Sequence, residues 1–428
     1  MTARRSPWVL AMALGLAAAL ALPGGSAMAK QSITFWHIWD AGPAREFIVD
    51  PVREFNATHR DIEVKELGIN FWDYWTKLQT ATAAGISPDV ALNDLGNVPQ
   101  RAATGVIRPL DEFLARDGIT LDTFWPATHP AIRWEGRVWA LPLETDVRVF
   151  YYNKQAFREA GLDPERPPRT WDELVAYSDK LTIRDARGRL VRVGFSPTWG
   201  NLYFWTIAWL NGGSFTDAQG RIKIDHPANI EALEWMVERV HAYGIRELSA
   251  LESNFGGGAM SPFISGKVAM IGENNTFLAN IRQYAPDMDF GVSGLPYTRT
   301  PASWSNGFSI EISSKTRYPE AAWEFVKFLT SRQKQLQYAR INGSMVGNVA
   351  AATADELMQD PFWRAIVDQM KVSRFRPFSM EAPTWYDTVL QPEIDNALRG
   401  IKTPAQALRD AQKAYEAEVA RYRQTQSR

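Results

Sequence analysis

Short apolar runs alternate with amphipathic stretches along most of this chain. Five of the runs are compact and bounded by turn residues, as buried strands are: residues 33–39, 62–67, 89–92, 147–152 and 268–271. The longer segments between them repeat their apolar residues at helical spacing. Strands separated by helices favour a parallel α/β sheet covered by helices.

Four of the amphipathic segments carry clear helix start or stop signals. Thr170 and Glu173 form a capping box that opens one helix. Residues 229–241 place four apolar side chains on one face, and a glycine follows them. Pro319 and Pro404 each stand at the first turn of a further predicted helix. These helices would cover the predicted sheet.

Two stretches are typical of crossings between domains. Residues 143–147 lead from a Pro-Leu-Glu-Thr segment into a strand, and residues 296–304 are rich in turn formers. A chain of 428 residues is long enough for two or three domains. The glycine triplet at 256–258 lacks the Lys-Ser/Thr pair of a phosphate-binding loop, so it predicts only a tight turn.

The N-terminal segment has the three parts of a secretory signal peptide. Arg4 and Arg5 precede an apolar run over residues 8–22, and Ala27-Met-Ala29 forms a cleavage pattern. We expect residues 1–29 to be removed; the alternative is a retained anchor. No cysteine follows Ala29 to carry a lipid, so we expect a periplasmic location. The arginine pair is a weak hint of twin-arginine export.

Composition narrows the function classes further. The formal net charge of −1 offers no basic excess for a nucleic-acid backbone. There are no cysteines, which excludes disulfides and thiol chemistry. The aromatic load of 17 Trp, 13 Tyr and 21 Phe exceeds what a core alone needs, so part of it is expected at a binding surface.

Motifs for common enzymatic chemistry are absent. None of the five histidines is paired at zinc-binding spacing, and we expect no metal or cofactor. Neither the serine-hydrolase elbow nor the glycine fingerprint for dinucleotides is found. Among 48 acidic residues a glycosidase carboxylate pair remains possible. We therefore expect no catalytic residues, and a secreted glycoside hydrolase is the rival hypothesis.

Several segments, in order and over nearly the whole chain, resemble the extracellular solute-binding proteins of bacterial ABC importers, in the carbohydrate-binding group. Each segment is weakly specific alone, but the ordered set is strong. The matching stretches are residues 33–39, 85–90, 136–142, 149–154, 168–174, 263–270, 290–296, 320–326 and 403–408.

The resemblance implies two α/β lobes joined by crossing strands, with a ligand cleft between them. The lobes would comprise residues 30–144 with 301–345, and residues 145–300 with 346–428. A third crossing would lie near 343–348. A protein of this kind binds a sugar, closes and delivers it to the permease subunits in the inner membrane, usually as a monomer. It has no catalytic activity.

A sugar needs polar partners for its hydroxyls and aromatic platforms for its C–H faces. The family commonly places ligand contacts at Asp40, after the first strand, and at the Asn93-Asp94 pair; a helix cap and an ordinary turn are the alternative roles. Asp146 matches an acidic family site at the first crossing. Glu144 takes that role if the alignment of this segment with the family shifts. For both Asp146 and Glu144 the alternative role is hydrogen bonding within the hinge.

The family likeness also suggests aromatic and amide contacts at further loops. Of Trp72, Tyr74 and Trp75 one is expected to face the cleft, with Trp72 preferred. Trp209 is expected in the core, four residues after Trp205. Amides replace the aromatic that the family often has after residues 268–271. The aromatic pair at residues 385–386 is expected to contact the ligand, and packing in the core is the alternative role. The remaining candidates are Trp39, Trp199, Asn201, Trp205, Asn274, Asn275, Trp304, Asn306, Trp385 and Tyr386.

A second ligand class stays open within the same fold. A polyol or glycerol phosphate would need an arginine or a helix N-terminus directed at the phosphate. Arg148 lies just beyond the first crossing and is the arginine expected to serve.

Overall fold

The computed structural model describes residues 30–41, 43–342 and 344–426. The expected signal peptide, residues 1–29, lies outside the described residues. Twelve strands are found in the described part. They are β1 (Gln31–His37), β2 (Ile62–Gly68), β3 (Val90–Asp94), β4 (Arg133–Trp134), β5 (Arg137–Val138), β6 (Ala140–Asn153), β7 (Ile183–Arg184), β8 (Leu190–Arg192), β9 (Met270–Asn274), β10 (Phe290–Ser293), β11 (Ser303–Ile312) and β12 (Ser373–Arg374).

Helices account for most of the remaining described chain, and a π-helical turn, Tyr386–Leu390, precedes the last two. The α-helices are α1 (Pro43–Thr58), α2 (Phe71–Ala83), α3 (Val98–Ala103), α4 (Asp111–Asp117), α5 (His129–Ile132), α6 (Lys154–Glu159), α7 (Trp171–Leu181), α8 (Phe204–Leu210), α9 (Pro227–Tyr243), α10 (Ile245–Glu252), α11 (Phe277–Tyr284), α12 (Pro319–Thr330), α13 (Arg332–Asn342), α14 (Val349–Ala352), α15 (Pro361–Lys371), α16 (Gln391–Leu398) and α17 (Pro404–Gln426).

The predicted elements are confirmed with small shifts of their ends. The five apolar runs lie in or overlap β1, β2, β3, β6 and β9, and the four helices with clear signals are α7, α9, α12 and α17. The Thr170 hydroxyl accepts a hydrogen bond from the Glu173 N–H, as the capping box requires. Local signals were therefore sufficient to find these elements.

The main sheet is mixed, with strand order β10–β6–β11–β3–β1–β2, and β9 and β12 add to β6 and β11. β1 runs parallel to β2 and β3, but β11 is antiparallel to β3 and β6, and β6 to β9 and β10. The prediction of a parallel sheet is wrong for this part. The chain runs along β6 in one direction and returns along β11, so these neighbours must be antiparallel.

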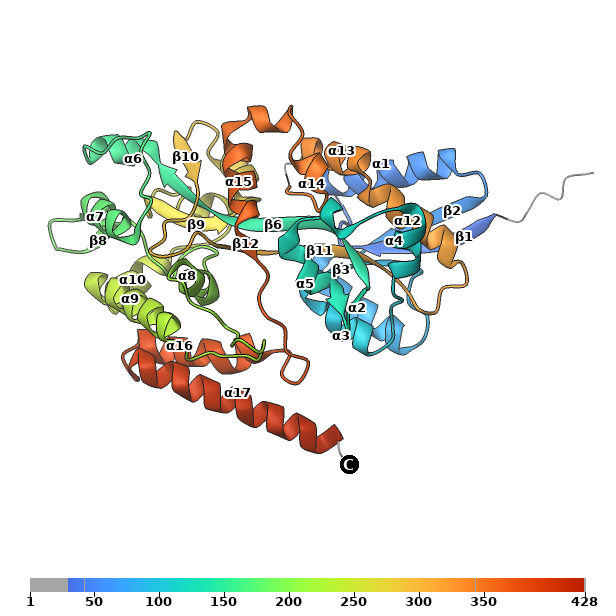
Figure 1. Cartoon of the computed structure of the whole chain (residues 1–428). Helices are drawn as coiled ribbons and strands as arrows, with labels where there is room; N and C mark the ends of the chain where they lie inside the picture. The colour runs from blue at the N-terminus through green and yellow to red at the C-terminus, as the bar shows by residue number, and fades with distance from the viewer. Residues whose placement is uncertain (1–29, 42, 343, 427–428) are drawn as a thin grey trace, which may run out of the picture.

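Separate apolar cores identify two α/β lobes, which Figure 1 shows side by side with β6 running between them. The first core gathers side chains of β1, β3, the distal half of β11 and α12, with Phe35 and Trp323 fully buried. The second lobe's core is built on the distal half of β6 and includes Phe150. A third cluster, which includes Tyr151, also takes in Trp125 and Tyr338 and so packs across the joint between the lobes. Each lobe is discontinuous in sequence.

Three chain segments meet where the lobes join. β6 pairs with β11 up to Val147 on one lobe's side and with β9 from Arg148 onward. The first predicted crossing, residues 143–147, lies within β6. The second crossing is formed by β11, which begins at Ser303 and therefore only overlaps the predicted crossing at residues 296–304. At the third, the Thr145 N–H donates to the Met345 carbonyl at 2.9 Å. Residue 343 of that stretch lies outside the described residues.

Gly307 in β11 shows how tightly these crossings pack. Its φ is +128°, and a Cβ there would lie 2.4 Å from the Glu144 carbonyl oxygen. A side chain would be strained and would clash with backbone, so glycine is required at this point of the joint.

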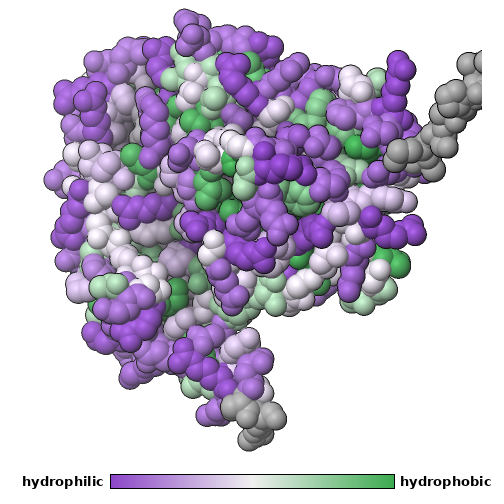
Figure 2. Space-filling model, turned by 45° about the vertical axis from the view of Figure 1, so that its right-hand side comes forward, coloured by the Kyte–Doolittle hydropathy of each residue, from purple (hydrophilic) through white to green (hydrophobic). Residues whose placement is uncertain are grey.

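The surface shown in Figure 2 is mostly hydrophilic, with apolar residues in separate small patches. Across the described residues, no helix combines the length and the apolar character that a membrane span requires.

Candidate functional site

Asp94 and Asn306 are in direct contact between the paired strands β3 and β11, at the joint between the lobes. Asp94 ends β3, and its Oδ1 accepts a hydrogen bond of 2.7 Å from the Gly96 N–H. Its other oxygen, Oδ2, accepts one of 3.2 Å from the Asn306 side-chain amide. Asp94 therefore has the turn role that the sequence analysis gave as the alternative, through Oδ1. Its Oδ2 is directed toward the joint between the lobes.

Asp146 lies on the opposite side of Asn306. Its Oδ1 accepts hydrogen bonds from the Asn306 N–H at 2.8 Å and from Arg148 Nη1 at 2.6 Å. Arg148 Nε donates to the Asn201 Oδ1 at 2.8 Å, and its guanidinium lies 3.6 Å from the centre of the Trp304 ring. We call Asp94, Asp146, Arg148, Asn201 and Asn306 the polar floor.

Burial shifts the pKa of both kinds of charge in the polar floor. It raises the pKa of Asp94, opposed by the Gly96 N–H and the Asn306 amide. It lowers the pKa of Arg148, opposed by Asp146. Because each charged group is held by hydrogen bonds, the polar floor is a prebuilt network whose geometry is set before a ligand arrives.

Four aromatic rings form a wall beside the polar floor. Tyr203 and Trp205 stack with their centroids 4.4 Å apart and their planes at 5°. Trp304 meets both edge-on at 5.0 Å, and Tyr386 meets Trp205 at 4.8 Å. We call these four residues the aromatic wall. Tyr203 is 41% exposed and therefore offers a free ring face.

The buried members of the aromatic wall carry donors that nothing in the described chain satisfies. The Trp205 and Trp304 indole N–H groups and the Tyr386 hydroxyl are buried and have no hydrogen-bonding partner there. Leaving a buried polar group unpaired costs about 1–3 kcal/mol. Three such groups lie in this one cluster, where most buried polar groups of a folded protein would be paired.

Arg376 reaches the same cluster from the segment after β12. Its guanidinium lies 4.9 Å from the Tyr386 ring centre, 5.6 Å from that of Trp205 and 5.9 Å from that of Trp304. It is half-buried and has neither a hydrogen bond nor an ion pair within the described chain. Sequence reasoning missed it; the signal was an arginine among the aromatics at 375, 378, 385 and 386.

A small cavity lies beside these groups. It has a volume of about 140 Å³ and is lined by residues 96, 97 and 100 of one lobe and by Arg376, Tyr386 and neighbouring residues of the other. Arg376 therefore faces a cavity that residues of both lobes line.

Glu144 is placed at the joint but away from the polar floor. Its side chain is 8% exposed and accepts a hydrogen bond of 2.6 Å from the Tyr338 hydroxyl. Burial raises its pKa to about 7. This contact is the hinge hydrogen bond that the sequence analysis gave as the alternative role of Glu144.

Three of the predicted amides carry structural bonds. Asn93 donates to Glu311 at 3.1 Å inside the first lobe, and Asn274 accepts from the Thr276 hydroxyl at 2.7 Å. Asn275 accepts from the Val147 N–H at 2.9 Å, while its own amide nitrogen is buried without a partner in the described chain. Their predicted role in ligand binding stays a prediction.

The candidates of the first lobe lie around α2 and the end of β1. Trp72 is 82% exposed, whereas the Tyr74 hydroxyl is buried against the Leu92 carbonyl and Trp75 stacks on Phe308. Asp40 is exposed on a separate pocket, and Trp39 packs edge-on against Phe308. None of these positions belongs to the polar floor.

Three further tryptophans that the sequence analysis considered are buried in the second lobe. Trp209, predicted to be core, is 3% exposed. Trp199 is also 3% exposed and meets Phe255 edge-on, and its indole N–H lacks a partner in the described chain. Trp385 is 1% exposed and stacks on Tyr386 at 3.8 Å, so it supports the aromatic wall from behind.

Glu273 is a further carboxylate that the sequence analysis did not select. It is half-buried in β9, and burial raises its pKa to about 7 against the lowering effect of Arg148. Within the described chain no group of three or more histidine, aspartate or glutamate side chains is placed to hold a metal ion.

Comparison with known proteins gives consistent results at the level of family and fold. A family model described as "Bacterial extracellular solute-binding protein" matches residues 41–336. The chain is 27% identical over 431 residues to the sn-glycerol-3-phosphate-binding periplasmic protein UgpB of Salmonella typhimurium, covering 92% of this chain and 94% of that protein.

Two solved structures also resemble the chain in fold. CpMnBP1 with mannotriose bound is 28% identical, with a TM-score of 0.76 over 91% of this chain and 100% of that one. The cyclic alpha-maltosyl-1,6-maltose binding protein from Arthrobacter globiformis shares the fold at 24% identity, with a TM-score of 0.77 over 91% of this chain and 99% of that one.

Proposed function

The chain belongs to the bacterial extracellular solute-binding protein family, and we propose that it binds a sugar or oligosaccharide between its lobes for an ABC importer. The observation that carries the proposal is the pairing of the polar floor with the aromatic wall. Asp94 of the first lobe and Asn201 of the second offer partners for hydroxyls from both sides of the joint, and Tyr203 offers an exposed ring face. A carbohydrate needs both kinds of contact.

A thermal-shift screen of neutral saccharides, polyols and sugar phosphates tests the proposal. A bound ligand at 100 times its dissociation constant stabilises the folded protein by about 2.7 kcal/mol. We expect at least one neutral saccharide to raise the melting temperature. An unchanged melting temperature across the whole panel would contradict ligand binding of this kind.

The protein acts, in this proposal, by binding alone. The rival hypothesis of a glycoside hydrolase predicts that the bound saccharide is cut. Incubating the protein with the saccharides that shift its melting temperature and separating the products by chromatography distinguishes the two. We expect the saccharides to be recovered intact.

Arg376 supports a second candidate ligand, a polyol or glycerol phosphate. Sequence reasoning assigned that role to Arg148, but Arg148 is engaged by Asp146 and Asn201. Arg376 makes no hydrogen bond or close ion pair in the described chain, although its charge acts on Asp94, and it would favour a phosphate. The 27% identity to the glycerol-phosphate binder supports the same ligand. In the screen this candidate predicts a larger shift with glycerol phosphate than with any neutral sugar.

Ligand binding is proposed to close the lobes about the crossings in β6 and β11. Only contacts with both lobes shift such an equilibrium, and the polar floor provides them. We propose the lobe limits given above, a monomeric protein, and delivery from the periplasm after removal of residues 1–29. Small-angle scattering should show a smaller radius of gyration with saturating ligand, at an unchanged molecular mass.

A further inference from the structure

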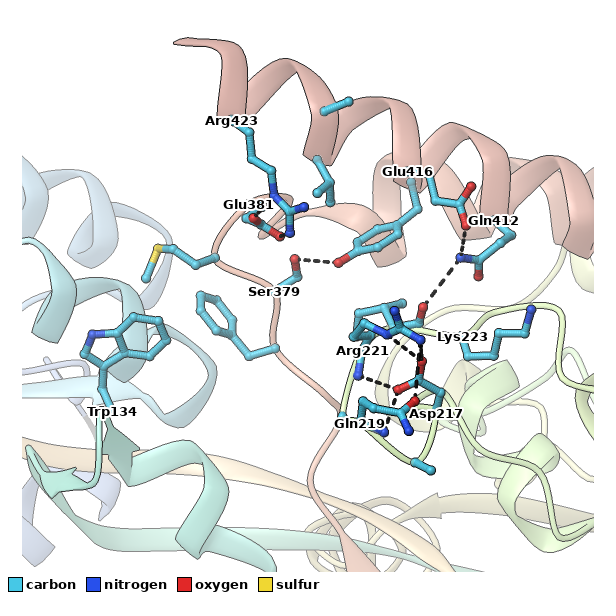
Figure 3. A pocket seen from close by; sticks show the side chains of 18 residues that line it. Trp134, Asp217, Gln219, Arg221, Lys223, Ser379, Glu381, Gln412, Glu416 and Arg423 are labelled. Carbon is cyan, nitrogen blue, oxygen red and sulfur yellow. Dashed lines mark hydrogen bonds and ion pairs between the residues drawn. The ribbon is translucent and has the colours of Figure 1, made fainter. Parts of the chain in front are cut away.

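A second, larger groove opens beside the interlobe cavity. It has a volume of about 1180 Å³ and lies under α17. Its walls are the turn at 217–223, residues 378–381 of the segment that carries Arg376, the side of α17 that carries Gln412, Tyr415 and Val419, and Trp134 of the first lobe. Figure 3 shows Trp134 on one side of this segment and Arg221 and Asp217 on the other.

The groove and the interlobe cavity are neighbours that share one lining residue. Phe378 lines both the groove and the small cavity that Arg376 faces. Its ring meets Trp134 edge-on, with centroids 6.5 Å apart. Both rings are half-buried, so each keeps an accessible surface. A ligand leaving the cavity past Phe378 would therefore touch an aromatic group of each lobe.

The charges of the groove cancel. Its lining holds three acidic residues, Asp217, Glu381 and Glu416, and three basic ones. Arg221 pairs with Asp217 at 2.7 Å and Arg423 with Glu381 at 2.6 Å. A groove without net charge has no attraction for a polyanion or an anionic membrane surface. Its paired side chains nevertheless present many hydrogen-bonding atoms.

Hydrogen-bonding groups beside aromatic surfaces suit a neutral polyhydroxylated chain. The Trp134 indole N–H has no partner within the described chain and is free to donate to a ligand hydroxyl. Ser379 and Tyr415 share a hydrogen bond of 2.9 Å at the floor of the groove, and either oxygen can accept another.

We propose that this groove holds the outer units of an extended neutral carbohydrate whose inner end occupies the interlobe cavity. The inference rests on the proposed function and makes it narrower: the ligand is an oligosaccharide rather than a monosaccharide. Trp134 and Phe378 are the specificity-determining residues for chain length.

The test is titration calorimetry of the chain from residue 30 onward with two series, mannose to mannohexaose and glucose to maltohexaose. In a series that binds, we expect the tetrasaccharide to bind at least about 10-fold more tightly than the disaccharide, or about 1.4 kcal/mol. Trp134→Ala should weaken tetrasaccharide binding about 10-fold and leave disaccharide binding unchanged. Trp134→Phe should retain most of the difference in affinity between the tetrasaccharide and the disaccharide. Ile401→Ala, at an exposed residue outside the groove, is the control and should retain all of that difference.

Each outcome decides the proposal. Equal affinities for the disaccharide and the tetrasaccharide would overturn it while leaving the proposed function intact. Equal weakening of both by Trp134→Ala would overturn it as well, because the residue would then act on folding or closure. If neither series bound, this inference would fail, and the proposed function would fail with it only if no saccharide of the thermal-shift panel bound either.

Discussion

The polar floor and the aromatic wall lie side by side but differ in how far their polar groups are satisfied. In the polar floor, Arg148 has hydrogen bonds to Asp146 and Asn201 and a ring face beneath it. In the aromatic wall, Trp205, Trp304 and Tyr386 each have a buried donor without a partner in the described chain. Arg376 contacts the rings of the wall but makes no hydrogen bond or close ion pair in the described chain.

The difference separates structural from recognition roles. A buried charge that is fully paired positions its neighbours, and removing one partner leaves the other uncompensated. A buried donor that is unpaired costs stability until a ligand accepts its hydrogen bond. We therefore expect substitutions in the polar floor to act mainly on folding and those around the aromatic wall mainly on ligand binding.

The largest expected effect is on stability, from Arg148→Met. The variant leaves the Asp146 carboxylate without its cation in the joint, and breaking a buried ion pair costs about 3–5 kcal/mol. Urea unfolding should show this loss. A loss below about 1 kcal/mol would mean that the polar floor is not a structural network. For the same reason Asp146→Ala should weaken folding as well as binding.

A pH dependence follows from Glu144, whose pKa burial raises to about 7 from 4.5. The folded state then binds more protons than the unfolded state between these pH values, so stability falls as pH rises from about 4.5 to about 7. The fall is at most about 3 kcal/mol for one group. Glu144→Gln, which keeps an acceptor for Tyr338, should remove this contribution.

Glu273 should add a second contribution of the same sign, because burial raises its pKa to about 7 as well. Glu273→Gln should remove a separate part of the pH dependence, and the double variant should remove both. A wild-type stability that rose over this range would contradict the assigned direction of both pKa shifts.

Arg376→Met should have a smaller effect, confined to binding. Its stability should change by no more than about 1 kcal/mol, the scale of its cation–π contacts. Loss of a charged hydrogen bond to the ligand is worth about 1.5–3 kcal/mol, which is roughly 10- to 100-fold in affinity. Arg364→Met, at an exposed arginine of α15, is the matched control. Equal affinities of both variants would remove Arg376 from the site.

The smallest effect is expected from Tyr203→Ala. An aromatic contact is worth about 0.5–1.5 kcal/mol beyond area burial, or roughly 2- to 10-fold in affinity. Calorimetry with the ligand from the screen measures it, and Tyr284→Ala, at another exposed tyrosine, is the control. Wild-type affinity in Tyr203→Ala would show that its exposed ring is not a platform for the ligand.

The elements of the fold could be predicted because their signals are local. Buried strands and capping boxes are encoded within a few residues, as in β1 and at Thr170 of α7. The antiparallel pairing of β6 with β11 joins residues about 160 positions apart, such as Asp146 and Asn306. No local pattern reports the direction in which two such strands meet.

The candidate site was predicted in part, for the same physical reason. Asp94, Asp146 and Asn306 were selected from strand ends and crossings, and they lie in one network. Tryptophan spacing could not distinguish the buried Trp385 from the exposed Tyr203. Arg148 and Arg376 look alike in sequence, and only the folded chain shows which one is already paired.

The most direct test of the account is a crystal structure of the complex with the ligand found in the screen. We predict that the ligand lies between Asp94 and Arg376, accepts hydrogen bonds from the Trp205, Trp304 or Tyr386 donors, and leaves the Arg148–Asp146 pair intact. A ligand bound elsewhere, with these three donors still unpaired, would contradict the assignment of the aromatic wall to recognition.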